Sequence, residues 1–310
     1  MKKDLLDLSS LTEQDIRSIL DLADKVKKNP DDYSQKLKGK TLLMMFEKPS
    51  LRTRVSFEVG MTQMGGHAIY YDISTSPMGK KESIEDTAKT SSRYVDIIMA
   101  RLFLHEHIEK LAQNAKVPVI NALTNFSHPC QILADLQTIK EKKGRLKGLK
   151  LCYVGDSNNN VTHSLIYGCA IVGMDISVGC PAGAEYEPSS EVIKKAKEIA
   201  ETSGSKITIT NNAKEAVKDA DIVYTDSWMS YHIPEEQKQE RLRIFQPYQV
   251  NKEIMSHAKS DAIFMNCLPA IRGMEQTADV IDGPQSVVFD EAENRLHSQK
   301  ALMLKLLKAE

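Results

Sequence analysis

The sequence has few cysteines and almost no net charge, and each scarcity argues against a class of protein. An odd number of cysteines without any C-x-x-C pair argues against a disulfide framework; the five are Cys130, Cys152, Cys169, Cys180 and Cys267. A formal net charge of −1 produces no global field that would favour nucleic acid or an anionic membrane surface. We therefore expect neither as a partner, and any anion site must be local.

Long apolar runs and the common nucleotide-binding loops are also missing. The apolar stretches fall far short of the roughly 20 residues that span a membrane. Acidic residues stand near the N-terminus, where a signal peptide needs its apolar region, so we expect a cytoplasmic protein. Neither G-x-G-x-x-G nor G-x-x-x-x-G-K-[ST] occurs, which argues against a dinucleotide site and a P-loop kinase. His105-Glu106-His107 lacks further ligands at a useful spacing, so we expect a helix start there rather than a metal site.

The pattern that is present is an alternation of short apolar runs with helical stripes. A chain of 310 residues with 41% hydrophobic and 27% charged residues is typical of a soluble protein with two domains. The alternation predicts βαβ units and parallel sheets. Candidate strands are 41–46, 68–71, 97–100, 118–121, 151–154, 175–178, 206–210, 222–225, 262–265 and 286–289. We thus predict an α/β fold with two domains, each a parallel sheet flanked by helices.

The division between the domains is expected in the helix that starts near Gln131. Its charged, glycine-containing end at 140–145 is the best linker candidate. The predicted domains are 1–138 and 139–295, followed by a terminal helix at 296–310.

Polar clusters follow six of the candidate strands directly or after a short loop. They begin at Lys48, Arg101, His128, Asp156, Asp226 and Cys267. Open parallel sheets bind ligands beyond the carboxyl ends of their strands, so these clusters predict an active site in a cleft between the two domains. The alternative is that loops after strands are simply polar, which accounts poorly for so many reactive side chains.

The most informative stretch is Phe-Glu-Lys-Pro-Ser-Leu-Arg-Thr-Arg-Val-Ser-Phe-Glu at residues 46–58. It joins a candidate strand to a helical pattern that begins near Leu51. The connection carries three cations and two hydroxyls: Lys48, Ser50, Arg52, Thr53 and Arg54. With the unpaired N–H groups of a helix start, they favour a socket for a phosphate-like dianion over a solvated basic turn.

This stretch resembles the carbamoyl-phosphate motif of the aspartate and ornithine carbamoyltransferases. Further matches follow in the family's order: Arg101, His128-Pro129-Cys130-Gln131, Asp226-Ser227-Trp228, Asn266-Cys267-Leu268-Pro269 and Glu291-Ala292-Glu293-Asn294-Arg295. They cover nearly the whole chain and most resemble the ornithine branch.

The resemblance implies a carbamoyl-phosphate site in the first domain. The residues it implies for this site are Ser50, Leu51, Arg52, Thr53, Arg101, His128 and Gln131 of the first predicted domain, with Cys267, Leu268 and Arg295 from the range of the second. Arg101 and His128 would act on the carbonyl oxygen, and Gln131 would bind the carbamoyl NH₂. In the family, the terminal helix returns to this domain, and the Leu268–Pro269 bond is cis.

The same resemblance implies an ornithine site in the second domain. Its residues would be Asn160, Asp226, Ser230 and Tyr231, with Cys267 orienting the side-chain amine as a third catalytic residue. Two departures bear on the amine: Asn266 stands where the branch usually has His, and Ser230-Tyr231-His232 replaces Ser-Met-Gly. Gly79-Lys80-Lys81 is similar instead to the aspartate branch, where a lysine reaches the neighbouring subunit's site. Aspartate itself is disfavoured, because Asp226 would repel a dicarboxylate.

The implied activity is transfer of a carbamoyl group from carbamoyl phosphate to L-ornithine, without metal or cofactor. The family resemblance also implies a homotrimer or an assembly of trimers. The nearest alternative is another amine, such as putrescine or an acylated ornithine. Two further alternatives are a thiol hydrolase that uses Cys267 with His128, and a non-catalytic protein that binds carbamoyl phosphate.

Overall fold

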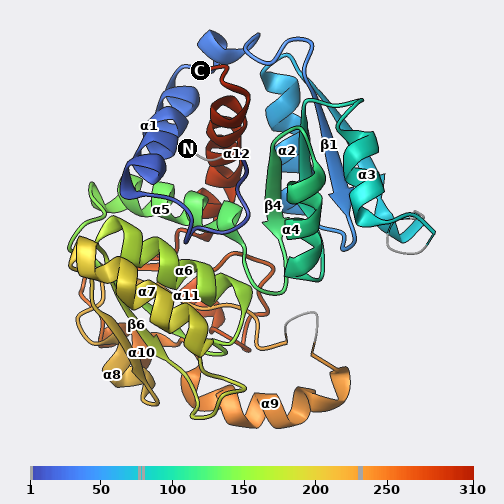
Figure 1. The fold of residues 1–310 in the computed structure, drawn as a ribbon. Coiled ribbons are helices and arrows are strands. Elements are labelled where there is room, and N and C mark those ends of the chain that lie inside the picture. The colour runs from blue at the N-terminus through green and yellow to red at the C-terminus, as the bar shows by residue number, and fades with distance from the viewer. Residues whose placement is uncertain (1–2, 76–77, 79–80, 230–232) are drawn as a thin grey trace. The chain divides into compact units, whose positions relative to one another are not determined.

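The computed structural model describes residues 3–75, 78, 81–229 and 233–310, and the chain divides into two compact units (Figure 1). Unit 1 comprises Met1–Gln137 and Glu293–Glu310, and unit 2 comprises Thr138–Ala292. Each unit contains one parallel sheet flanked by helices, so the predicted α/β architecture is confirmed. Ser230 and Tyr231, two of the expected ornithine residues, lie outside the described residues, as do His232, Gly79 and Lys80.

Unit 1 is built on a parallel sheet in the order β2-β1-β3-β4. Its strands are β1 (Thr41–Phe46), β2 (His67–Asp72), β3 (Ile97–Arg101) and β4 (Val119–Leu123). Its helices are α1 (Glu13–Lys28), η1 (Pro30–Tyr33), α2 (Leu51–Gln63), η2 (Ile73–Thr75), α3 (Ile84–Ser91), α4 (His105–Asn114), part of α5 (Pro129–Lys143) and most of α12 (Val288–Leu307). His105 begins α4, as the sequence predicts.

The order of the strands in unit 1 reverses direction at the pair β1–β3. The chain passes from β1 outward to β2 and then returns across β1 to β3 and β4. Right-handed crossovers therefore put α2 on one face of the sheet and α3 and α4 on the other. The apolar core under α3 and α4 agrees with this placement, since it joins Ile84, Ala88, Ile108 and Leu111 to Met45, Ile98 and Ala100 of the sheet.

Helix α12 completes unit 1 by packing on α2. Gly60 lies at the contact: a Cβ there would stand 3.2 Å from Lys300 Cγ and 3.3 Å from Met303 Cε, so these side chains would have to shift by a few tenths of an ångström to admit one. Lys300 donates to Gln63 Oε1 at 2.8 Å. At the other side, Lys27 of α1 donates to Asn294 Oδ1 at 2.9 Å, and α1 and α12 lie side by side in Figure 1.

Unit 2 is built on a second parallel sheet in the order β7-β6-β5-β8-β9. Its strands are β5 (Lys150–Val154), β6 (Asp175–Gly179), β7 (Ile207–Thr210), β8 (Ile222–Tyr224) and β9 (Ile263–Met265). Its helices are α6 (Asn160–Val172), α7 (Ser190–Ser203), α8 (Ala213–Val217), η3 (Glu235–Gln237), α9 (Lys238–Phe245), η4 (Gln246–Tyr248), α10 (Lys252–Ser256) and α11 (Ala278–Ile281).

Unit 2 also reverses its strand order, here at the pair β5–β8. The chain runs outward through β6 and β7 and returns to β8 and β9. The right-handed rule puts α6 and α7 on one face, where they pack on each other, and α8 and α10 on the opposite face. A core of Val217, Ile254 and Phe264 with their neighbours fills the second face.

One expected strand is wrong. At 286–289, Ser286 makes only an isolated bridge to Phe264, and α12 already begins at Val288. Short apolar runs do not distinguish a strand from a buried helix start by periodicity. Here Val288 begins the helix, while Val287 precedes it and donates its backbone N–H to Phe264 O at 3.0 Å. Helix α5 continues through Lys143, so most of the expected linker at 140–145 is helical. In the part of the chain that the structure describes, no helix is long and apolar enough to cross a membrane.

Candidate functional site

The corner between β1 and α2 has the form of an anion socket. Ser50 is the N-cap of α2, and its hydroxyl accepts from the backbone N–H of Thr53 at 3.3 Å. The first turn contains no acidic residue, so nothing there opposes the positive end of the helix dipole. Leu51 begins the helix with its side chain exposed. Leu51 would therefore contact a bound anion through its backbone and not through its side chain.

The two arginines of this corner differ in their neighbours. Arg54 faces away: its Nε donates to Glu58 Oε2 at 3.2 Å, and its guanidinium stacks 3.9 Å from the ring centroid of Tyr70. Arg52 lies close enough to His128 for its charge to lower that residue's pKa. Of the two, Arg52 is therefore the arginine whose charge acts on His128.

Arg101 ends β3, and His128 follows the neighbouring strand β4 of the same sheet after a short loop. Arg101 is the last residue of β3 and lies in register with Phe46 at the end of β1, so it stands beside the β1–α2 corner. His128 follows β4 and immediately precedes α5, with its side chain buried. Burial, and then the charges of Arg295, Arg101 and Arg52, hold the pKa of His128 well below its ordinary value. The imidazole is consequently neutral at pH 7.

Arg295 of α12 connects three helices through its guanidinium. Nη1 donates to Gln131 Oε1 at 2.7 Å, Nη2 to Thr53 Oγ1 at 3.3 Å, and Nε to Gln299 Oε1 at 2.9 Å. Gln131 in turn donates through Nε2 to Asp135 Oδ1 at 2.8 Å. Every one of these side chains is buried, so the network fixes Arg295 and Gln131 in one arrangement.

In unit 2, the expected amino-acid residues Asn160 and Asp226 lie at the ends of two paired strands. Asn160 is the first residue of α6, whose N-cap Asn159 accepts from Thr162 N at 2.9 Å. Asp226 follows β8, which pairs directly with β5. Both residues thus lie where the strand order reverses, the usual place for a ligand in an open α/β sheet.

Cys267 contacts Asp226 within unit 2. Its Sγ donates to Asp226 Oδ1 at 3.3 Å, so the cysteine is held as a thiol beside a carboxylate. Asn266 anchors this turn: its Oδ1 accepts from Leu268 N at 2.8 Å, and its Nδ2 donates to Gln276 Oε1 at 3.1 Å. The Leu268–Pro269 peptide bond is cis, as the resemblance implies.

Two family models match the chain. The carbamoyl-P binding domain of aspartate/ornithine carbamoyltransferase matches residues 3–141, and the Asp/Orn binding domain of the same family matches residues 147–306. The chain belongs to the aspartate/ornithine carbamoyltransferase family. The resemblance noted in the sequence is thereby confirmed.

Individual members of this family are similar over nearly their whole length. A protein of Methanocaldococcus jannaschii named ornithine carbamoyltransferase is 52% identical over 299 residues, which cover 96% of this chain and 97% of the relative. One of Bacillus subtilis with the same name is 53% identical over 305 residues, covering 98% and 94%. Among solved structures, ornithine carbamoyltransferase from Pyrococcus furiosus superimposes with a TM-score of 0.93 at 51% identity, covering 97% of this chain and 96% of that one.

The structure adds supporting residues that sequence reasoning missed. Gln299 holds Arg295 and donates through Nε2 to Ser56 Oγ at 2.7 Å. The i, i+4 spacing of Arg295 and Gln299 on a predicted helix was the available signal. In the sequence Glu291 stands out only as part of a motif, yet its carboxylate accepts from Tyr224 OH at 3.0 Å and from Asn266 N at 3.1 Å. Among the described residues, no group of three or more His, Cys, Asp or Glu side chains could hold a metal ion.

Proposed function

We propose that this member of the family transfers the carbamoyl group of carbamoyl phosphate to the side-chain amine of L-ornithine, giving L-citrulline and phosphate. The observation that carries this proposal is the cluster of Arg52, Arg101 and Arg295 around a neutral His128 in unit 1. The names of relatives that are more than 50% identical over nearly the whole chain support the same reaction.

Carbamoyl phosphate matches the chemistry of unit 1. The helix start at Ser50 with Arg52 and Thr53 supplies N–H groups, a hydroxyl and a cation for the phosphate. Arg101 would contact both the phosphate and the carbonyl oxygen. Neutral His128 can donate an N–H to that oxygen as negative charge grows on it, and preorganised donors of this kind lower the barrier.

The remaining side chains of unit 1 would hold the carbamoyl group itself. Arg295 binds Gln131 Oε1, and Asp135 binds Gln131 Nε2, so both ends of this amide are fixed. A fixed Gln131 can orient the carbamoyl NH₂ relative to the attacking amine. Arg295 adds a further cation for the phosphate.

L-Ornithine matches the chemistry of unit 2. The Asp226 carboxylate would bind the α-ammonium group, and Asn160 would bind the α-carboxylate. The side-chain amine would then attack beside Cys267, whose thiol is hydrogen-bonded to Asp226 and orients the amine. The C–O bond to phosphate breaks as the new C–N bond forms. The electron pair of the broken bond and the amine proton leave with phosphate, so the reaction requires no cofactor.

The proposed active site includes residues from both units. We infer that the carboxyl ends of the two sheets face one cleft between domains 1–138 and 139–295, with the terminal helix 296–310 belonging to the first domain. Ser230 and Tyr231 remain part of the proposed ornithine site on the family resemblance alone. The Leu268 carbonyl is also proposed to face the amine.

We also infer that the protein acts in the cytoplasm as a homotrimer or an assembly of trimers. Large apolar side chains are exposed on unit 1: Leu51 at 75%, Val55 at 46%, Ile69 at 41% and Tyr94 at 78%. Strand β2 carries Ile69 and has only β1 as a neighbour among the described residues, so a second copy could cover this edge. Light scattering on the eluting protein measures the assembly directly.

The reaction is tested by following the carbamoyl carbon. Wild-type protein is mixed with ¹³C-labelled carbamoyl phosphate and ornithine, and the products are identified by NMR while phosphate is assayed in parallel. We expect the label in the ureido carbon of citrulline, with one phosphate released for each citrulline. Consumption of carbamoyl phosphate without a ureido product would favour a hydrolase, and binding without consumption would favour a non-catalytic protein; either result would refute the proposal.

A further inference from the structure

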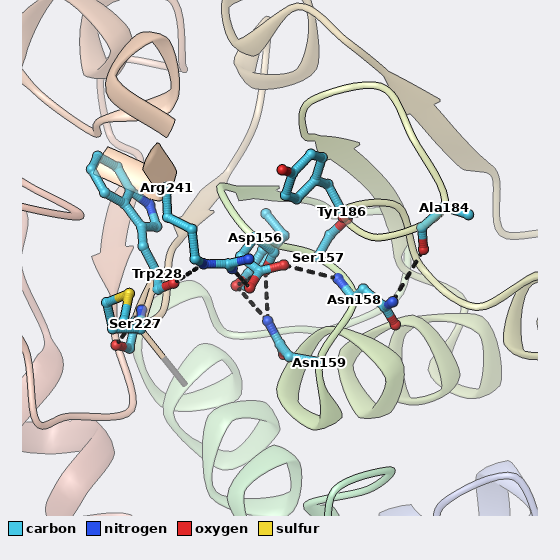
Figure 2. Close-up of polar contacts among 11 residues, drawn as sticks. Asp156, Ser157, Asn158, Asn159, Ala184, Tyr186, Ser227, Trp228 and Arg241 are labelled. Atoms are coloured by element: carbon cyan, nitrogen blue, oxygen red, sulfur yellow. Dashed lines mark hydrogen bonds and ion pairs between the residues drawn. The ribbon is translucent and has the colours of Figure 1, made fainter. Parts of the chain in front are cut away.

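A single buried guanidinium contacts the loops that carry Asn160 and Asp226. Arg241, from α9, donates through Nε to the Trp228 carbonyl oxygen at 2.7 Å. Its Nη2 donates to Asp156 Oδ2, forming an ion pair in which both side chains are almost fully buried. Figure 2 shows Arg241 between the two loops, with Trp228 on one side and Asp156 on the other.

The loop after β5 is tied to Asn160 through Asp156. The Asp156 carbonyl oxygen accepts from Tyr153 OH at 2.7 Å and from Asn159 Nδ2 at 2.6 Å. Asn159 is also the N-cap of α6, so its position determines where the helix begins. Any shift of Asp156 is therefore transmitted to Asn160, the first residue of that helix.

The loop after β8 is tied to Asp226 through Trp228, two residues further along. The Trp228 ring stacks on Phe245 of α9, with centroids 5.7 Å apart. Arg241 lies over the same Phe245 ring at 4.9 Å. Gly155, with φ +131°, allows the indole to approach, because a Cβ there would stand 3.2 Å from Trp228 Nε1. The loop therefore has a defined place against both α9 and the loop after β5.

The stability of the fold alone does not account for the buried ion pair between Arg241 and Asp156. Removing two charges from water is costly, and a protein with well-packed apolar residues in place of the ion pair is often equally stable or more stable. Burial raises the pKa of Asp156 to about 6, although the adjacent Arg241 lowers it. A planar guanidinium does what an apolar pair cannot: it fixes the direction and separation of two acceptors on different loops.

We propose that Arg241 is a positioning residue for the amino-acid substrate. By binding the Trp228 carbonyl and the Asp156 carboxylate, it sets the distance between Asp226 and Asn160. Those two residues are the proposed partners of the α-ammonium and α-carboxylate, so this inference rests on the proposed function. A misplacement of about 1 Å at such a site can reduce the rate roughly a hundredfold.

The test compares Arg241→Met, Arg241→Lys and the charge-free double variant Asp156→Asn/Arg241→Met. Arg243→Met is the matched control, since Arg243 is on the same helix but is exposed and, among the described residues, donates within that helix to Gln239 O. For each protein, kcat, the KM for ornithine and the KM for carbamoyl phosphate are measured, together with the thermal midpoint.

We expect Arg241→Met to raise the KM for ornithine roughly tenfold to a hundredfold, with the KM for carbamoyl phosphate changed less than about threefold. Arg241→Lys keeps the charge without the planar fork, so its KM for ornithine should fall between those of wild type and Arg241→Met. Arg243→Met should match wild type.

The double variant distinguishes positioning from stability. It leaves no unpaired buried charge, so its thermal midpoint should recover relative to Arg241→Met, while its KM for ornithine stays high. If the KM for ornithine recovers together with the midpoint, Arg241 only stabilises the fold and the inference is wrong. Equal rises in both KM values would overturn it as well. A wild-type protein that makes no citrulline would instead refute the proposed function.

Discussion

The candidate residues fall into two halves, one in each unit, which share an architecture and differ in the sign of their charge. In unit 1, the reversal of strand order at β1–β3 brings together Arg52 and Arg101, which Arg295 joins from α12. In unit 2, the reversal at β5–β8 brings together Asp156 and Asp226, and the guanidinium of Arg241 is already paired there. One half is suited to a dianion and the other to an ammonium group.

This difference shows which part of the chemistry the fold supplies. The parallel sheets determine where a ligand can bind, because a crevice forms wherever adjacent strands send their connections in opposite directions. The side chains directly after the strands supply the charge, and they can be opposite on two similar scaffolds. Substitutions should therefore act on one substrate at a time, according to the unit in which they lie.

The largest effect is expected in the cationic half. Arg52→Ala and Arg101→Ala each remove a charge-assisted contact worth roughly 1.5–3 kcal/mol, so kcat/KM for carbamoyl phosphate should fall roughly tenfold to a hundredfold. Part of the loss should lie in kcat, since charge moves toward these groups in the transition state. Arg54→Ala is the matched control, because its side chain is occupied by Glu58 and Tyr70 on the surface. Steady-state kinetics in which Arg54→Ala is as damaged as Arg52→Ala would contradict the assignment.

A comparable but separate effect is expected in the acidic half. Asp226→Asn keeps the size of the side chain and removes the charge that would bind the α-ammonium, so the KM for ornithine should rise roughly tenfold. The KM for carbamoyl phosphate should stay near its wild-type value. Asp282→Asn, which removes an exposed carboxylate paired with Arg272, is the control. A change confined to carbamoyl phosphate would show that the two halves do not divide the substrates.

A smaller effect is expected for Cys267→Ser. A hydroxyl can still donate to Asp226 and orient the amine, so turnover should fall less than about tenfold, whereas a covalent nucleophile could not be replaced so easily. Mass spectrometry of the enzyme during turnover should find Cys267 unmodified. A carbamoylated Cys267 that forms and decays at the rate of turnover would establish the thiol mechanism instead.

The smallest effect concerns stability and pH. Because the pKa of His128 is lowered in the folded protein, the unfolded chain takes up a proton that the folded protein does not as pH falls below about 6.5. The free energy of unfolding therefore falls as the pH drops below that value, by up to about 1.4 kcal/mol per pH unit from His128. His128→Gln should lose less stability than wild type between pH 7.5 and 5, as measured by denaturant unfolding. Equal losses would mean that His128 titrates normally.

The sequence predicted well the polar residues that follow the strands of both sheets, because the signals for them are local. An apolar run followed at once by Arg101 or Asp226 specifies a strand and its polar end within a few residues. The interactions that hold those polar residues together are long-range: Arg241 binds Asp156 across 85 positions of the chain. Its helix also contains Arg243, and only the tertiary structure, which buries Arg241 beside Phe245, Trp228 and Asp156, distinguishes the two. The expected strand at 286–289 failed for the converse reason, since a few apolar residues carry too little periodicity.

The central claim is that the acidic half selects an amino acid by its α-ammonium and α-carboxylate groups. It is tested most directly by kcat/KM of the wild-type protein for ornithine, lysine, putrescine and Nα-acetylornithine at one pH and one concentration of carbamoyl phosphate. Ornithine should be the best substrate. Putrescine has no α-carboxylate for Asn160, the acetylated compound has no α-ammonium for Asp226, and lysine places its amine one methylene too far. If putrescine or Nα-acetylornithine exceeds ornithine, the assignment of the amine and of Asp226 is wrong.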